Sequence, residues 1–182
     1  MHHDLERILF DEEQIARSLR GLASSISEHY GERPFLVVPV LKGSILFAAD
    51  LIRRLPGPLE LAFASARSYG AGTEPGPLEL ELLPPAEELS GREVLLIDDI
   101  LDSGRTLERL ARELRARGAR DVRTCVLLDK PSRRRVAIEA DWRCFEVADE
   151  FVVGYGLDLG GRYRNLPYVG TLRAQRIGGT RP

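Results

Sequence analysis

The chain has few cysteines, little net charge and no long apolar run, and each of these features argues against certain classes of protein. The two cysteines, Cys125 and Cys144, lack the spacing of a metal site or a redox pair. A net charge of −2 gives no electrostatic signature of nucleic-acid or membrane binding. No apolar run approaches a membrane span, and the first residues, with Asp4 and Glu6 beside Arg7, do not form a signal peptide. We therefore expect a cytoplasmic protein.

Lysine is also scarce, because only Lys42 and Lys130 among 26 basic residues are lysines. A chain that uses arginine for ordinary surface charge can retain lysine where a compact point charge is needed. His2 and His3 are too few for a metal-binding tract, and we expect them in a loose terminus. The length suits one domain over residues 1–182 with a real core.

The stretch from Val94 to Leu107 organises the rest of the chain. Its apolar run, Val94–Ile97, predicts a short buried strand that stops at two adjacent carboxylates, Asp98 and Asp99. The small-residue turn Asp102–Thr106 follows, and a helix with leucines three and four residues apart comes after it. In open α/β sheets this edge, at the carboxyl ends of the strands, is where ligands bind.

The residue types in this turn indicate a phosphate site. Ser103 and Thr106 offer hydroxyls, Gly104 permits close approach of the backbone, and free N–H groups at a helix start attract an anion. The two carboxylates would repel a bound phosphate unless Mg²⁺ or sugar hydroxyls lay between them. A phosphorylated sugar bound with Mg²⁺ satisfies all of these groups. The alternative is that Asp102 and Ser103 only cap the helix and the acid pair only ends a strand.

A second strand–turn–helix unit repeats this pattern nearer the N-terminus. The strand is predicted over 35–40, and the turn Leu41–Ser44 leads into a helix that ends at about Arg54. Gly43 permits a backbone approach to an anion, and Lys42 lies at the mouth of the turn. An ordinary turn is the alternative, because the segment lacks the Walker pattern.

The remaining elements follow from apolar patterning. Further strands are predicted at 59–66, 78–82, 122–128, 142–147 and 151–153. Asp11 and Gln14 form a plausible capping box for a helix through Ile26. The basic cluster Arg133–Arg135 is expected in a solvated loop, and residues 173–182 in a frayed tail.

The segment 67–77 is rich in glycine and proline and cannot form regular structure. It is either a slack hairpin loop or a lid that excludes water from a reacting centre.

The stretch from Val94 to Leu107 resembles the phosphoribosyl-pyrophosphate (PRPP) signature of the type I phosphoribosyltransferases. The shared order is an apolar run, two acids, an apolar pair, Asp, a small residue, Gly, any residue and Thr. Two further motifs, LLDKPSRR and DEFVVGYGLD…RYRNLPYVG, resemble only the hypoxanthine-guanine branch of that family. The resemblance implies a Rossmann-like α/β fold with a central, mainly parallel sheet flanked by helices. It also implies a mobile lid loop at about 67–77 and a small purine-binding hood at about 129–172.

The resemblance also assigns roles by position. PRPP or phosphate binding falls to Asp98, Asp99, Ser103, Gly104, Arg105, Thr106, Lys42, Gly43 and Arg164. Purine binding falls to Lys130, Phe151, Val152 and Asp158, and the lid contains Ser68 and Tyr69. The Mg²⁺ cofactor would be bound by Asp158, Asp98 and Asp99. Asp102 would lie near purine N7 as the general base. In this family the Lys-Gly turn often contains a non-proline cis peptide bond.

The reaction implied by the resemblance is purine salvage, in which PRPP and hypoxanthine or guanine give IMP or GMP and pyrophosphate. A 6-oxopurine presents an acceptor at O6 and a donor at N1, which match the ammonium of Lys130 and the backbone carbonyl of Val152. Adenine reverses both groups, and each buried mismatch costs about 1–3 kcal/mol. The family usually has Glu-Asp where this chain has Asp98-Asp99, so the ribose contact of Asp98 is direct, water-bridged or absent.

Small-molecule substrates and a homodimer or homotetramer are expected, with no nucleic-acid or membrane partner. A rival hypothesis is an RNA-binding regulator built on the same fold. Such a protein needs a basic face, for which Arg133–Arg135 is the dense candidate. Specificity for xanthine or uracil stays open within the enzyme class.

Overall fold

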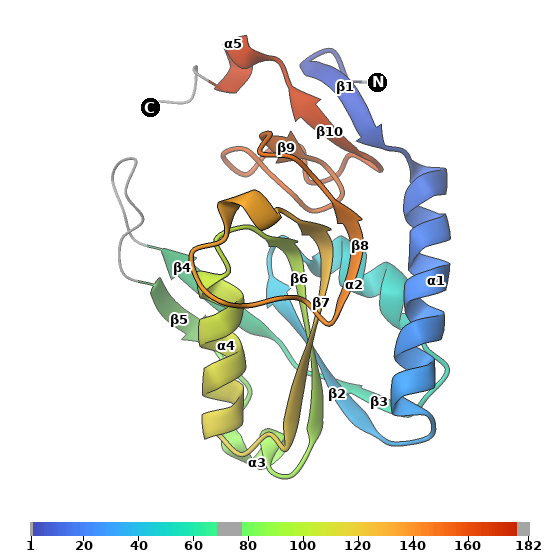
Figure 1. Ribbon diagram of the computed structural model, residues 1–182, viewed down its shortest axis with the longest axis vertical. Helices are drawn as coiled ribbons and strands as arrows, with labels where there is room; N and C mark the ends of the chain where they lie inside the picture. Colours follow the sequence, from blue (N-terminus) through green and yellow to red (C-terminus); the bar gives the residue numbers. More distant parts are fainter. Residues whose placement is uncertain (1, 69–77, 178–182) are drawn as a thin grey trace.

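The computed structural model describes residues 2–68 and 78–177, in which a seven-stranded sheet lies below a smaller three-stranded sheet (Figure 1). The strands of the large sheet are β2 (Phe35–Leu41), β3 (Leu59–Leu61), β4 (Ala64–Ser68), β5 (Leu78–Leu82), β6 (Glu93–Leu101), β7 (Asp121–Asp129) and β8 (Trp142–Glu146). Their order is β5-β4-β2-β6-β7-β8, with β3 also paired to β2. Every pairing is parallel except β4–β5. The predicted mainly parallel sheet is therefore confirmed.

Helices cover both faces of this sheet (Figure 1). They are α1 (Glu12–Tyr30), α2 (Ile45–Ile52), α3 (Ala86–Leu89) and α4 (Arg105–Ala116). A 3-10 turn η1 (Pro131–Arg133) follows β7, and a short α5 (Ala174–Ile177) follows β10 beside the small sheet (Figure 1). The capping box at the start of α1 is confirmed. The Gln14 N–H donates to the Asp11 carboxylate over 2.8 Å, and the Asp11 N–H donates to the Gln14 side chain over 2.9 Å.

The core is split by the sheet into two layers. Val37 of β2 packs with α1 and α2, whereas the next residue, Val38, packs with α3 and α4. In β6 the same alternation places Leu95 with the first layer and Leu96 with the second. Successive side chains of a strand point to opposite faces, so a strand covered on both faces reads as a continuous apolar run.

Two strand predictions need correction. The acid pair does not end β6, because backbone pairing with β7 continues from Asp98 opposite Val126 to Leu101 opposite Asp129. Backbone pairing is independent of side-chain polarity, so a strand passes through polar residues where its neighbour continues. The single strand predicted over 59–66 is two strands, because β3 and β4 pair with different parts of β2.

The small sheet is formed by segments that are distant in the sequence. It is antiparallel, with the order β1-β10-β9, and contains β1 (Leu5–Phe10), β9 (Val152–Val153) and β10 (Val169–Leu172). In Figure 1 it lies above the end of the large sheet where β6 and β7 finish. The hood boundaries of 129–172 stay a prediction. The sequence did not predict β1, which is a strand of the small sheet.

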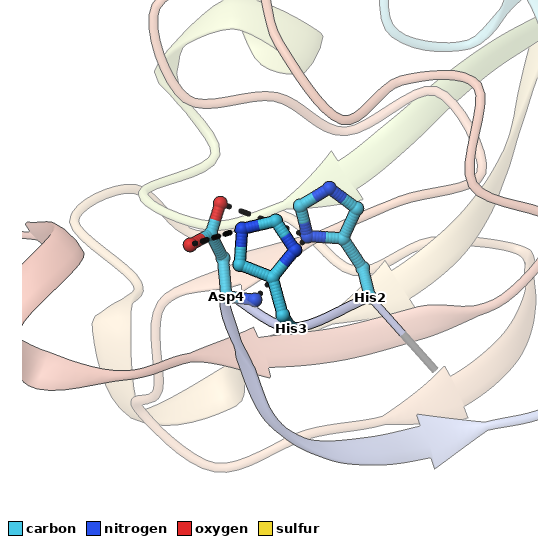
Figure 2. A group of neighbouring side chains, drawn as sticks. All are labelled: His2, His3 and Asp4. Carbon is cyan, nitrogen blue, oxygen red and sulfur yellow. Dashed lines mark hydrogen bonds and ion pairs between the residues drawn. The ribbon is translucent and has the colours of Figure 1, made fainter.

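The expected loose N-terminus is wrong. Figure 2 shows His2 and His3 folded against Asp4 at the start of β1. The His2 N–H donates to the Tyr168 hydroxyl over 2.9 Å, and the Tyr163 hydroxyl donates to the Asp4 carboxylate over 2.9 Å. These contacts fix the first residues on the hood.

The predicted frayed tail is also wrong over its described part. Residues 174–177 form α5, and Arg176 forms an ion pair of 2.6 Å with Asp4. None of the helices in the described part of the chain has the length and apolarity that a membrane crossing needs.

Candidate active site

Two adjoining cavities lie at the carboxyl ends of the parallel strands. The first has a volume of about 260 Å³ and is lined by Val40, Leu41, Gly43, Ala66, Asp98, Asp99, Ile100, Leu101, Asp102, Ser103, Gly104, Thr106 and Leu107. The second, of about 520 Å³, is lined by Asp99, Ile100, Asp102, Lys130, Arg133, Asp149, Glu150, Phe151, Val152, Leu157 and Asp158. Asp99, Ile100 and Asp102 border both cavities, so groups bound in the two cavities would meet at these residues.

The turn between β6 and α4 has the form of an anion site. Gly104 occupies the N-cap position with φ +84° and has no side chain that could cap the helix. A Cβ at Gly104 would lie 2.5 Å from Ile138 Cγ2, so only glycine fits there. Asp102 makes no cap contact with α4, whereas Ser103 Oγ accepts the Arg105 N–H over 3.5 Å, so Ser103 keeps part of the cap role that the alternative gave it. The N–H groups of Thr106 and Leu107 are left for a ligand.

The acid pair, Asp98 and Asp99, lies beside this turn in surroundings that disfavour the charged forms of both carboxyls. Burial, and then the neighbouring charge of Asp99, raises the pKa of the Asp98 carboxyl well above its usual value. Burial also raises the pKa of Asp99, against a hydrogen bond with Asp98 and the charge of Arg164. Asp98 is only 7% exposed, and its Oδ1 accepts the Asp99 N–H over 2.9 Å. Two buried carboxyls this close together both ionise readily only when a bound cation or hydroxyl donors stabilise their charges.

The Lys-Gly turn after β2 contacts this pair directly. The Leu41–Lys42 peptide bond is cis, as the resemblance implied. A Cβ at Gly43 would lie 1.7 Å from Asp99 Oδ2, so the backbone runs against that carboxylate. Lys42 is exposed at the turn, where its ammonium can reach a bound anion. The structure therefore brings Gly43 against the acid pair, whereas Lys42 is exposed beside it in the chain and lines neither cavity.

Arg164 reaches the same place from the hood. Its guanidinium donates to the Gly156 carbonyl over 2.5 Å and forms an ion pair of 2.6 Å with Asp158. Gly156 has φ +104°, and a Cβ there would lie 2.0 Å from the Gly43 carbonyl oxygen. The hood thus contacts the Lys-Gly turn through a glycine on each side.

Gly156→Ala is expected to raise the KM for PRPP, the substrate that the resemblance implies, by roughly 10-fold or more, because the new methyl group must displace the turn at Gly43. Steady-state kinetics with varied PRPP measure this change. Gly160→Ala is the matched control, since Gly160 also has positive φ (+60°) but an added Cβ there meets nothing within 4 Å. Equal KM values for the two variants would show that the contact between Gly156 and Gly43 is unimportant.

The predicted purine-binding residues line the second cavity. Lys130 is 6% exposed, and its ammonium donates to the Glu150 carbonyl over 2.6 Å. An ammonium has three donors, so two remain for a ligand. Phe151 is 40% exposed on the hood, whereas Val152 is buried in β9. A planar ring bound in this cavity could stack on the aromatic face of Phe151 and meet the backbone edge of Val152.

Asp158 lies near the acid pair without forming a protein-only metal cluster. Its carboxylate is bound by Arg164 and by the Gly161 N–H over 2.6 Å. Among the described residues, the one group of three metal-ligating side chains within 4.8 Å is His2, His3 and Asp4. There the His2 Nδ1 accepts the Asp4 N–H, and Tyr163 and Arg176 bind the Asp4 carboxylate. His2 Nδ1 and the Asp4 carboxylate are thus already contacted by the protein, whereas the His3 ring is exposed and lies 3.4 Å from Asp4 Oδ1.

The predicted Mg²⁺ ligands fit that ion by their chemistry. Mg²⁺ takes oxygen ligands, and typically one or two carboxylates with substrate phosphates and water. Asp98 and Asp99 are adjacent, and burial with mutual repulsion raises the pKa of Asp98, so a cation would relieve the pair.

The lid residues cannot be assessed in the same way. Ser68 ends β4 and its backbone pairs with Leu78 of β5. Tyr69 and the segment 69–77 lie outside the described residues. The lid therefore stays a prediction.

The basic cluster after Lys130 is exposed at Arg133 and Arg135, as expected, but Arg134 is partly buried and bound within the protein. Arg134 donates to the Leu101 and Asp102 carbonyls over 2.8 and 2.5 Å and pairs with the buried Asp129. Arg133 pairs with Asp102 over 3.1 Å. No local pattern in the sequence indicates these contacts, beyond the position of both arginines just after a strand end.

Comparisons with known proteins agree with this geometry. Residues 7–159 match the family model of the phosphoribosyl transferase domain. The chain is 42% identical over 176 residues to the hypoxanthine-guanine phosphoribosyltransferase of Staphylococcus epidermidis, covering 96% of this chain and 98% of that protein. It is 44% identical to the bifunctional protein TilS/HprT of Listeria innocua, with 96% of this chain and only 27% of that protein covered.

A crystal structure of a hypoxanthine phosphoribosyltransferase from Staphylococcus aureus superposes with a TM-score of 0.90 at 38% identity, covering 97% of this chain and 96% of that one. The chain therefore belongs to the phosphoribosyltransferases, and within them to the hypoxanthine-guanine group.

Proposed function

We propose that the protein transfers the 5-phosphoribosyl group of PRPP to hypoxanthine and guanine, forming IMP and GMP and releasing pyrophosphate. The observation that carries this proposal is the pair of adjoining cavities. One contains a phosphate-type turn and an acid pair, and the other contains a buried lysine beside an exposed aromatic ring. Because Asp102 borders both, a reaction between a sugar and a base would take place beside it.

PRPP would bind in the first cavity. The 5′-phosphate accepts hydrogen bonds from the N–H groups at the start of α4 and from the hydroxyls of Ser103 and Thr106. Asp98 and Asp99 accept the ribose hydroxyls. The Lys42-Gly43 turn and Arg164 face the pyrophosphate, which is the leaving group.

The purine would bind in the second cavity. Lys130 donates to O6, the backbone of Val152 faces N1 and position 2, and Phe151 stacks on the ring. Adenine has an amino group at position 6 and an unprotonated N1. Two unmatched groups would then cost about 2–6 kcal/mol, which is about 30- to 10⁴-fold in discrimination.

In the reaction, the bond from ribose C1′ to the pyrophosphate oxygen breaks and a bond from C1′ to purine N9 forms. Positive charge develops on the ribose, as in glycoside chemistry, and the nearby carboxylates stabilise it. The purine loses one proton, which Asp102 accepts as general base. Asp98, Asp99 and Asp158 would hold Mg²⁺, whose positive charge, when bound, would offset the charge of the departing pyrophosphate.

The Arg133–Arg135 cluster lends the rival RNA-binding function little support. Arg133 pairs with Asp102 and Asp149, and Arg134 pairs with Asp129, so two of the three clustered arginines are neutralised within the protein. The cytoplasmic location and the homodimer or homotetramer expected from the sequence stay predictions.

Incubation of the purified protein with hypoxanthine, PRPP and Mg²⁺ is expected to yield IMP and pyrophosphate in equal amounts, and guanine should yield GMP. Chromatography of the nucleotides and an enzymatic pyrophosphate assay measure both products. Excess EDTA should stop the reaction, and added Mg²⁺ should restore it. Failure to form nucleotide from either base would contradict the proposed function, and undiminished turnover in EDTA would contradict the Mg²⁺ assignment.

A further inference from the structure

The side chain of Arg133 joins the two sides of the second cavity. Its Nε lies 3.1 Å from Asp102 Oδ1, on the turn after β6. Its Nη1 lies 3.4 Å from Asp149 Oδ2, in the hood segment before β9. Arg133 itself ends the 3-10 turn η1 and lines the cavity beside Lys130. One guanidinium therefore connects the residue at the junction of the cavities with the hood.

The backbone and the side chain of Asp102 are held by different residues. Arg134 binds the Leu101 and Asp102 carbonyls, so the main chain at this point is fixed without Arg133. The Asp102 carboxylate has no other ion pair or side-chain hydrogen bond within the described residues than the one with Arg133. Without that contact the carboxylate would be free to rotate about its side-chain bonds.

The contact with Arg133 still leaves Asp102 able to accept a proton. A carboxylate offers about four lone pairs on two oxygens, and Arg133 binds only Oδ1. The other oxygen, Oδ2, has no hydrogen-bond partner among residues 2–68 and 78–177. An arginine bound to one oxygen can thus orient the other toward a ligand in the cavity.

We propose that Arg133 is a positioning residue that orients the Asp102 carboxylate toward the purine before the purine binds. Asp149 in turn orients the guanidinium. This inference rests on the proposed function, in which Asp102 accepts the purine proton. It assigns a role in the reaction to an arginine that the sequence alone placed in a solvated loop.

Arg133→Met is expected to lower kcat by roughly 3- to 10-fold, since the pair is half-exposed and exposed ion pairs contribute little each. The KM for PRPP should stay within about twofold of the wild-type value, because Arg134 still holds the turn. Arg133→Lys should recover part of the loss, because a lysine can reach one carboxylate but cannot bridge two. A kcat equal to or above the wild-type value in Arg133→Met would overturn the proposal.

Arg135→Met is the matched control. It removes the same charge two residues away, from an exposed side chain that makes no ion pair or hydrogen bond with any described residue. Its kcat and KM should stay within about 1.5-fold of the wild-type values. Thermal unfolding of all variants shows whether any loss of kcat reflects loss of fold.

The decisive experiment is a double-mutant cycle with Asp102→Asn. If Arg133 acts through Asp102, then Arg133→Met should lower kcat in the wild-type background and change it by less than about 1.5-fold in the Asp102→Asn background. The same fold-decrease in both backgrounds would show that Arg133 acts independently, which would overturn the inference while leaving the proposed reaction intact. If the wild-type protein forms no IMP, the proposed function itself fails.

Discussion

Asp102→Asn is expected to lower kcat by roughly 10²–10⁴-fold, the usual contribution of general base catalysis. Asparagine keeps the size of aspartate and can still accept the Arg133 hydrogen bond through its amide oxygen, but it cannot accept the purine proton. The dissociation constant for PRPP should change by less than about threefold, because the turn's N–H groups and hydroxyls remain. Pre-steady-state kinetics at saturating substrates and calorimetric titration with PRPP measure the two quantities.

A cap role for Asp102 cannot explain such a loss, because Gly104 occupies the N-cap position of α4. Thermal unfolding of the variant therefore provides the control, and its midpoint should lie near that of the wild-type protein. A near-normal kcat in a folded variant would mean that the purine proton goes to water or to another group.

Lys130→Met is expected to lower kcat/KM for hypoxanthine by about 10²-fold or more, while the KM for PRPP changes little. The buried ammonium donates to the Glu150 carbonyl and has two donors left for purine O6. Methionine fills the space but leaves O6 of the bound purine without a partner in a buried site. Initial rates with each substrate varied in turn separate the two effects.

Lys42→Met is the matched comparison, because Lys42 is the chain's other lysine and lies at the turn that we propose faces pyrophosphate. This variant should raise the KM for PRPP more than it impairs hypoxanthine recognition. Equal losses for both substrates in both variants would contradict the separate roles of the two lysines.

The central part of the fold could be predicted from the sequence because its signals are local. A strand covered on both faces must be apolar throughout, and Phe35–Leu41 and Val94–Ile97 are. The turn after β6 could likewise be predicted from its small residues, and the side chain of Ile138 leaves no room for a Cβ at Gly104. The strand and turn signals come from residues within a few positions of one another, whereas the crowding at Gly104 does not.

The rest could not be predicted because it depends on contacts between distant segments. β1 pairs with β10, so Leu5 lies opposite Leu172, and nothing in the first ten residues indicates that partner. Glu150 is bound by Arg7 of β1 through its carboxylate and by Lys130 through its carbonyl. Such contacts leave no periodic pattern in a single sequence, so the hood was the least predictable part of the site.

The central claim is that the second cavity selects 6-oxopurines, and a one-pot competition tests it most directly. Hypoxanthine, guanine, adenine, uracil and orotate are supplied at equal concentration with limiting PRPP and Mg²⁺, and chromatography resolves the nucleotide products. Competing substrates partition according to their kcat/KM values. The account predicts IMP and GMP, with each other nucleotide at least about 30-fold less abundant. Comparable amounts of AMP, or a dominant pyrimidine nucleotide, would contradict it.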